Sequence, residues 1–128
     1  MTMGEGYMIH CERCGTLKED VLIGGGMIPP ENLRQEIMEG RFGLDAKEIM
    51  LEHPDWPYYV DHLPFSCSCN YKTSFPVVVF FTDDGKEIRC DRHRCSKCGK
   101  VMRADSWGEP ICWKCGGHVT IIPTMLWD

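Results

Sequence analysis

Four close pairs of cysteines constrain this chain more than any other feature of its sequence. Three pairs have the form Cys-x-x-Cys-Gly, and the fourth is Cys-x-Cys-Asn. Glycine and asparagine readily adopt a left-handed backbone, which lets a metal knuckle close with its N–H groups directed at the sulfurs. The sequence therefore predicts four metal-binding knuckles. Their cysteines are Cys11 and Cys14, Cys67 and Cys69, Cys95 and Cys98, and Cys112 and Cys115.

The spacing of the pairs predicts how they combine. A structural zinc ion sits in a tetrahedron, commonly between two pairs of thiolates. The last two pairs, Cys95/Cys98 and Cys112/Cys115, are separated by 13 residues that suit a hairpin, so we expect them to form a zinc ribbon. The first two pairs, separated by 52 residues, would form a second site. Both sites would be closed and structural, with two zinc ions per chain.

The same cysteines leave alternatives open. Iron in a rubredoxin-like tetrathiolate has the same ligands as zinc, and two redox-active dithiols are a further possibility. Cys90 lies outside the four pairs; it would either pack in the core or, with Asp91 and His93, replace a ligand. His10 and His118 flank knuckles and would support or replace a thiolate ligand.

Residues between the first two pairs predict a strand and two short helices. Residues 17–23 have the composition of a strand. Pro29 and Pro30 would open a helix that ends near Glu39. Asp45 would be the N-cap of a second, shorter helix.

The segment before the basic region predicts a loop and a hairpin. Residues 53–65 combine aromatic residues with three prolines, so we expect an irregular loop. Asp84-Gly85 between residues 75–82 and 87–89 indicates a β-hairpin. The predicted fold class is small α+β, with zinc-ribbon hairpins and one or two short helices in an insertion. We expect an N-terminal zinc module at 1–90 and a C-terminal ribbon with an apolar tail at 91–128.

Charge and hydropathy narrow the environment and the partners. The sequence has no apolar run typical of a signal peptide or a membrane span, so we expect a cytoplasmic protein with reduced thiols and no membrane contact. The formal net charge of −5 disfavours a general nucleic-acid binder. Residues 86–103, however, carry seven basic and two acidic side chains, which keeps nucleic acid as an alternative partner.

Three segments resemble the small zinc-binding subunit of acetone and acetophenone carboxylases. They are Cys11-Glu12-Arg13-Cys14-Gly15-Thr16-Leu17, Cys67-Ser68-Cys69 and Pro30-Glu31-Asn32-Leu33-Arg34. Enzymes of this family are large cytoplasmic complexes that carboxylate ketones with bicarbonate at the expense of ATP. The resemblance implies that this chain is a subunit without catalytic residues, and that its partners are the large ATP-binding and substrate-binding subunits.

The sequence as a whole predicts a zinc-binding structural subunit of a multi-subunit enzyme. Eight thiolates in two closed sites leave no open metal position for chemistry, and no catalytic or phosphate-binding motif is present, so we expect no catalytic or cofactor-binding residues beyond the metal ligands. The alternatives are a zinc-ribbon nucleic-acid binder and a rubredoxin-like electron carrier.

Overall fold

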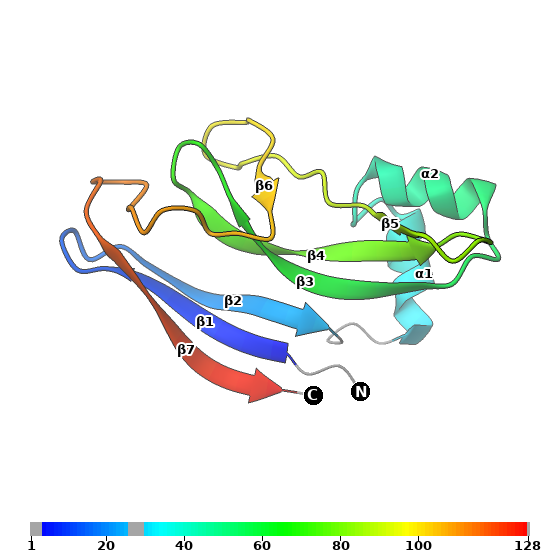
Figure 1. Ribbon diagram of the computed structural model, residues 1–128, viewed down its shortest axis with the longest axis horizontal. Coiled ribbons are helices and arrows are strands. Elements are labelled where there is room, and N and C mark those ends of the chain that lie inside the picture. The colour runs from blue at the N-terminus through cyan, green and yellow to red at the C-terminus, as the bar shows by residue number, and fades with distance from the viewer. Residues whose placement is uncertain (1–3, 26–29, 128) are drawn as a thin grey trace.

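An antiparallel β-sheet with two helices dominates the structure, a computed structural model that describes residues 4–25 and 30–127 (Figure 1). The sheet has seven strands in the order β5-β4-β3-β2-β1-β7, and β6 pairs with β3 outside this order. The strands are β1 Gly4–Cys11, β2 Leu17–Gly25, β3 Tyr58–Ser66, β4 Lys72–Phe81, β5 Glu87–Arg89, β6 Arg103–Ala104 and β7 Val119–Trp127, and the helices are α1 Pro30–Met38 and α2 Leu44–Glu52.

Two parts of the sheet meet at a short junction. Strand β1 pairs with β7 from end to end and with β2 over most of its length, and β3 pairs along its whole length with β4. Between these parts, β2 and β3 pair only at Gly24 with His62 and at Gly25 with Asp61. Nδ1 of His62 lies 3.0 Å from the carbonyl oxygen of Gly24, which supports this junction.

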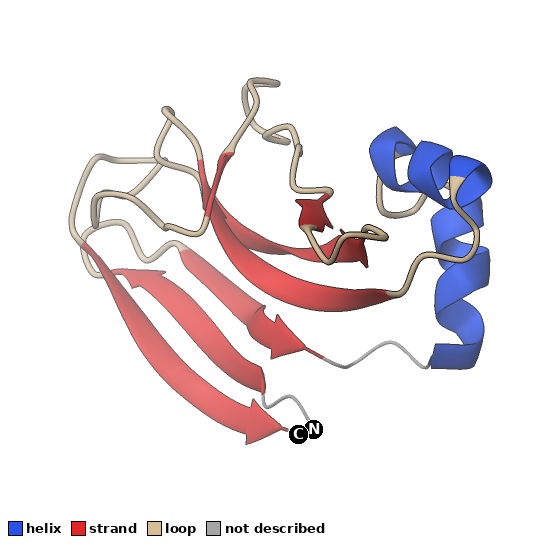
Figure 2. Cartoon of the chain, turned by 45° about the vertical axis from the view of Figure 1, so that its right-hand side comes forward, coloured by secondary structure: helices blue, strands red, loops and turns tan. Residues whose placement is uncertain are grey.

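The helices cover one face of β3 and β4 at one end of the sheet, and the knuckle loops lie at the opposite end (Figures 1 and 2). Alternate residues of β4 point to opposite faces of the sheet. Val78 and Phe80 pack under the helices, whereas Val77 and Val79 belong to a separate buried cluster on the other face. The core under the helices, called here the helix-end core, consists of Leu33, Ile37, Phe42, Ala46, Met50, Val60, Val78, Phe80 and Cys90.

Two smaller buried clusters lie at the knuckle end, and both include cysteines from the predicted pairs. One combines Phe65, Cys67, Tyr71, Val77, Val79, Cys95 and Met102. The other combines Ile9, Cys11, Val21, Cys112 and Val119. The metal-ligand candidates are therefore part of the packing of this end and are not confined to surface loops.

Several predicted elements are confirmed, with small differences at their ends. The strand expected at 17–23 is β2, the hairpin is β4 with β5, and the first helix is α1; Pro29 lies outside the described residues. Helix α2 also forms, but its N-cap is Gly43 at φ 100°, without a side-chain cap hydrogen bond. The prediction of Asp45 as N-cap was therefore wrong, because the left-handed Gly43 sets the turn into the helix instead.

The loop predicted for 53–65 was also wrong, since most of it is strand β3. Its Pro64 lies where β3 has no partner on one side, because β2 pairs at 61–62 and β6 at 65–66. Pro76, in the neighbouring strand, lies outside the β4–β5 pairing in the same way. Proline is tolerated in a strand where its missing N–H faces no ladder. Among the described residues, no helix is long and apolar enough to cross a membrane.

Candidate metal centres

Two groups of four cysteines are positioned to hold metal ions. The first contains Cys11, Cys14, Cys112 and Cys115, and the second contains Cys67, Cys69, Cys95 and Cys98. Within each group all sulfur atoms lie within 4.8 Å of one another. All eight cysteines singled out in the sequence belong to these groups, and the structure is compatible with two metal sites per chain.

The predicted combination of the pairs was wrong. Cys95/Cys98 was expected to join Cys112/Cys115 in a ribbon, but each group takes one pair from the first 90 residues and one from the last 38. The zinc ribbon is accordingly not confirmed. The division of the chain into domains at 1–90 and 91–128 stays a prediction. Each cysteine group combines ligands from both of these predicted domains.

Strand order explains the exchange of partners. Cys11 ends β1 and pairs with Val119, the first residue of β7, so the knuckle just before β7 lies beside the β1–β2 turn. Phe65 in β3 pairs with Ala104 in β6, which brings Cys95/Cys98 beside the β3–β4 turn. Trp107, one of the 13 residues expected to form a hairpin between the last two pairs, donates from Nε1 to the carbonyl oxygen of Thr73 in β4 at 2.8 Å.

The sulfur positions fit a tetrathiolate. A tetrahedron with Zn–S bonds of about 2.3 Å has sulfurs about 3.8 Å apart. In the first group, Cys11 and Cys115 are 3.5 Å apart and Cys14 and Cys112 are 3.7 Å apart. In the second, the Cys67–Cys98 and Cys69–Cys95 distances are 3.2 and 3.7 Å. Each group thus needs only small shifts to surround one ion.

The residue after each pair has the predicted left-handed backbone. The φ angles are 77° at Gly15, 72° at Asn70, 78° at Gly99 and 74° at Gly116. In the three Cys-x-x-Cys knuckles this residue donates its N–H to the carbonyl of the first cysteine, at 2.8 to 3.1 Å. In the shorter Cys67 knuckle, Asn70 makes the corresponding bond at 2.8 Å. The prediction from the glycines and the asparagine is confirmed.

Backbone N–H groups of the knuckles point at the sulfurs. Lys97 N lies 3.3 Å from Cys95 Sγ, Lys114 N lies 3.3 Å from Cys112 Sγ, and Gly117 N lies 3.3 Å from Cys115 Sγ. Donors at this position stabilise a thiolate and leave its remaining lone pairs for a metal. The knuckles are therefore built to bind ionised cysteines.

Each group combines a readily ionised thiol with one that holds its proton. Hydrogen bonds from Thr16 lower the pKa of Cys14 to about 6. Burial opposes ionisation of Cys67, but the backbone N–H of Cys69 and the neighbouring sulfurs lower its pKa to about 6. Burial raises the pKa of Cys69 to about 12. Four adjacent thiolates repel one another, so full ionisation of either group requires a cation among them.

A buried lysine lies between the two groups. Lys72, at the start of β4, is 1% exposed. Its Nζ donates to the carbonyl oxygens of Asn70 and Ile111, at 3.0 Å each. Asn70 completes a knuckle of the second group, and Ile111 precedes Cys112 of the first. Burial lowers the pKa of Lys72, and the Cys112 and Cys69 thiolates oppose that change. Nothing in the sequence marked this lysine out.

The other ligand candidates lie elsewhere. Cys90 belongs to the helix-end core, where burial raises the pKa of its thiol to about 11, so the packing interpretation describes it. His93 stacks on Phe75 with ring centroids 4.4 Å apart. Neither group of ligand candidates includes His10 or His118.

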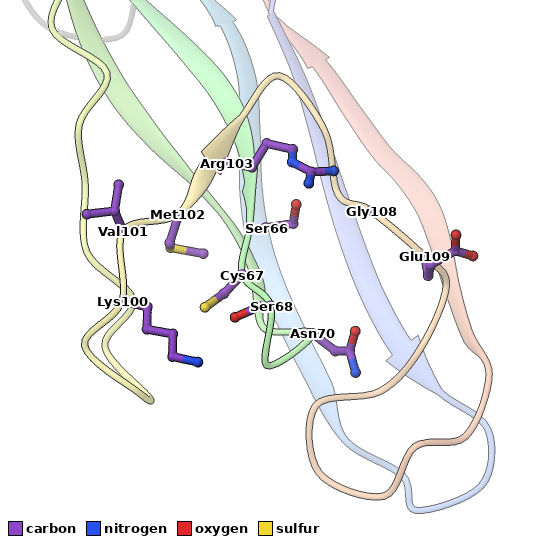
Figure 3. A pocket seen from close by; sticks show the side chains of 10 residues that line it. All are labelled: Ser66, Cys67, Ser68, Asn70, Lys100, Val101, Met102, Arg103, Gly108 and Glu109. Carbon is purple, nitrogen blue, oxygen red and sulfur yellow. The ribbon is translucent and has the colours of Figure 1, made fainter.

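A cavity of about 440 Å³ lies beside the second group (Figure 3). Cys67 and Ser68 lie in the middle of its lining, and Lys100 and Arg103 contribute two cations. Glu109 lines the same cavity and offsets part of this charge.

Comparison of the chain with protein-family models, with curated proteins and with solved structures found no match.

Proposed function

We propose that this chain is a zinc-binding structural subunit whose two ions hold its fold together. The observation that carries the proposal is the presence of two complete sets of four thiol ligands that join turns distant in the sequence. Four thiolates fill a tetrahedral site and leave no position for water or substrate, which is the arrangement of structural zinc.

Zinc is the metal that a purely structural role favours. Thiolates are soft ligands, and a tetrahedral set of four selects zinc or iron. The N–H···S contacts and the closed knuckles suit either ion. A structural role needs no redox change, and zinc supplies a fixed charge without one. Iron, and with it electron transfer, remains the alternative that metal analysis decides.

The outer edge of β7 supports a protein partner. Strand β7 ends the sheet order and pairs only with β1 among the described strands. Ile122, on this edge strand, is 37% exposed. An edge strand offers unpaired backbone groups to a strand of another protein. The predicted role as a subunit of a multi-subunit enzyme fits such a surface, and the resemblance proposes a ketone carboxylase as the host.

The proposal is tested by purifying the protein from its own cells and measuring metal content and native mass together. We expect about two zinc ions per chain in a particle much larger than the 14.7 kDa chain, with larger subunits co-purifying. A monomer would contradict the subunit role. Iron in place of zinc, visible as colour, would contradict the metal assignment and support the electron carrier.

A further inference from the structure

A groove of about 170 Å³ lies where the two metal groups meet on the surface. Its lining includes three lysines, Lys18, Lys97 and Lys114, and two aromatic residues, Tyr71 and Trp113. These residues lie within the four knuckles or a few residues after them, although the knuckles are far apart in the sequence. The groove therefore exists only when the knuckle end is assembled.

The groove has positive charge without acidic partners. Among residues 4–25 and 30–127, no carboxylate lines it. In the part of the chain that the structure describes, the lysines Lys18, Lys97 and Lys114 make none of the ion pairs, whereas Lys86 and Arg89 are paired with aspartates. The ammonium group of Lys18 donates to the Tyr71 hydroxyl at 3.0 Å.

Aromatic rings form the floor between these cations. The Tyr71 ring is buried, and the Nζ atoms of Lys18 and Lys97 lie 5.3 and 5.4 Å from its centroid. The half-buried Trp113 meets Tyr71 edge to face, with centroids 5.2 Å apart. The lysines thus surround a fixed aromatic surface on which a flat ring can stack.

We propose that this groove binds single-stranded nucleic acid, with phosphates at the three lysines and a base against Trp113. Cationic grooves with aromatic platforms are the usual means of binding single strands. The groove is smaller than the roughly 300 Å³ at which small-molecule pockets begin, so it suits one segment of a polymer. An acidic peptide would use the lysines but not the aromatic floor, and a duplex would keep its bases away from Trp113.

The proposal goes beyond the structural role and does not depend on the host enzyme. The net charge of −5 repels nucleic acid at long range, so binding is expected to be weak. Neutralisation of about three phosphates on a single strand gives a slope of about −2 in log affinity against log salt. That slope is a direct signature of the three lysines.

The test uses the full metal-loaded chain and fluorescence anisotropy of a labelled oligothymidylate of about 12 nucleotides. We expect affinity to fall about fifteenfold between about 50 and about 200 mM salt. The triple variant Lys18→Gln, Lys97→Gln, Lys114→Gln should lose affinity by about tenfold or more and flatten the salt dependence. Trp113→Phe should weaken binding without changing the slope.

A matched control removes the same charge at the helix end. The variant Arg41→Gln, Lys47→Gln, Lys86→Gln should bind almost as the unmodified protein does, because these side chains lie outside the groove. Retention of both metal ions shows that each variant is folded; if the groove variant loses metal, the exposed single changes Lys97→Gln and Lys114→Gln replace it.

Three results would overturn the proposal. They are no binding at the lowest salt, equal losses in the groove and control variants, and competition by polyglutamate or by a duplex as strong as competition by unlabelled oligothymidylate.

Discussion

The two ends of the molecule are stabilised in different ways. At the helix end, nine buried residues from α1, α2, β3 and β4 and their flanking segments form an apolar core that needs no ligand. At the knuckle end, each buried cluster is smaller and contains ligand cysteines. Because β3 and β4 contribute to both ends, one pair of strands joins a core held by packing to a region that we propose is held by metal.

In the account proposed here, metal lets a short chain extend its sheet beyond what its apolar residues can stabilise. Small domains bury too little surface to stabilise every element by packing alone, and metals often supply the remainder. Here the turns of β1–β2 and β3–β4 and the two later knuckles contribute their cysteines to the two smaller buried clusters, so we expect metal to add to the packing there. The following changes test that division between the ends.

Removal of the metal ions should have the largest effect. We expect a chelator to lower the free energy of unfolding by about 5 kcal/mol or more, because metal binding contributes directly to folding. Hydrogen exchange should accelerate at the four knuckles and β7 first, while α1 and α2 keep more protection. Equal loss of protection at both ends would show that the division is incorrect.

Acid should destabilise the knuckle end of the metal-loaded protein, as a chelator does. Cysteines must be ionised to bind metal, so metal is released as pH falls. The hydrogen bonds that lower the pKa values of the Cys14 and Cys67 thiols to about 6 delay the protonation of these two ligands as pH falls. Metal release measured against pH should precede the loss of helical circular dichroism; simultaneous loss would argue against separate ends.

A cavity in the helix-end core should destabilise without releasing metal. Ile37 is fully buried there, and Ile37→Ala is expected to cost about 3 kcal/mol of unfolding free energy. Metal content should remain that of the unmodified protein. Chemical denaturation and metal analysis of the same sample check this, with the exposed Leu51→Ala as control. Release of metal by Ile37→Ala would contradict the account.

Loss of the buried lysine should affect both metal groups at once. Lys72→Met keeps the length of the side chain but leaves the carbonyls of Asn70 and Ile111 without their donor. We expect a loss of about 2 kcal/mol in unfolding free energy and faster transfer of both metals to a chelator. Lys86→Met, an exposed change, is the control. Faster release from only one group would mean that Lys72 does not link the two.

The two metal groups should differ slightly from each other. Cys14 and Cys112 are 98 residues apart in sequence, whereas Cys69 and Cys95 are 26 apart. A metal link that closes the longer loop removes more entropy from the unfolded chain, by about 1 kcal/mol, so Cys112→Ser should destabilise more than Cys95→Ser by about that amount. Both cysteines are buried, which makes the comparison matched. The reverse order in denaturation would contradict it.

Local features could be predicted from the sequence, and long-range ones could not. The glycine or asparagine after each pair determines the backbone of its own knuckle, so those turns were predictable. Which knuckles meet depends on the strand order, which places β7 beside β1 and β6 beside β3. The nearest pairs in sequence were therefore the wrong partners.

The position of the basic surface also depends on long-range folding and could not be predicted from the sequence. The basic segment 86–103 does not form a single patch: Lys86 and Arg89 pair with acids, while Lys100 and Arg103 line the larger cavity. Only Lys97 of this segment lies in the groove beside Tyr71 and Trp113. The other two lysines of the groove, Lys18 and Lys114, come from regions with few basic residues. A surface of this kind depends on folding and leaves no contiguous signal in the sequence.

The pairing of the knuckles is the central claim, and cobalt binding to two quadruple variants tests it most directly. One variant replaces Cys67, Cys69, Cys95 and Cys98 by serine, and the other replaces Cys95, Cys98, Cys112 and Cys115. The first leaves one group intact and should bind one cobalt ion with the absorption of a tetrahedral tetrathiolate. The second damages both groups and should give no such spectrum. A tetrathiolate spectrum from the second variant and none from the first would contradict the account.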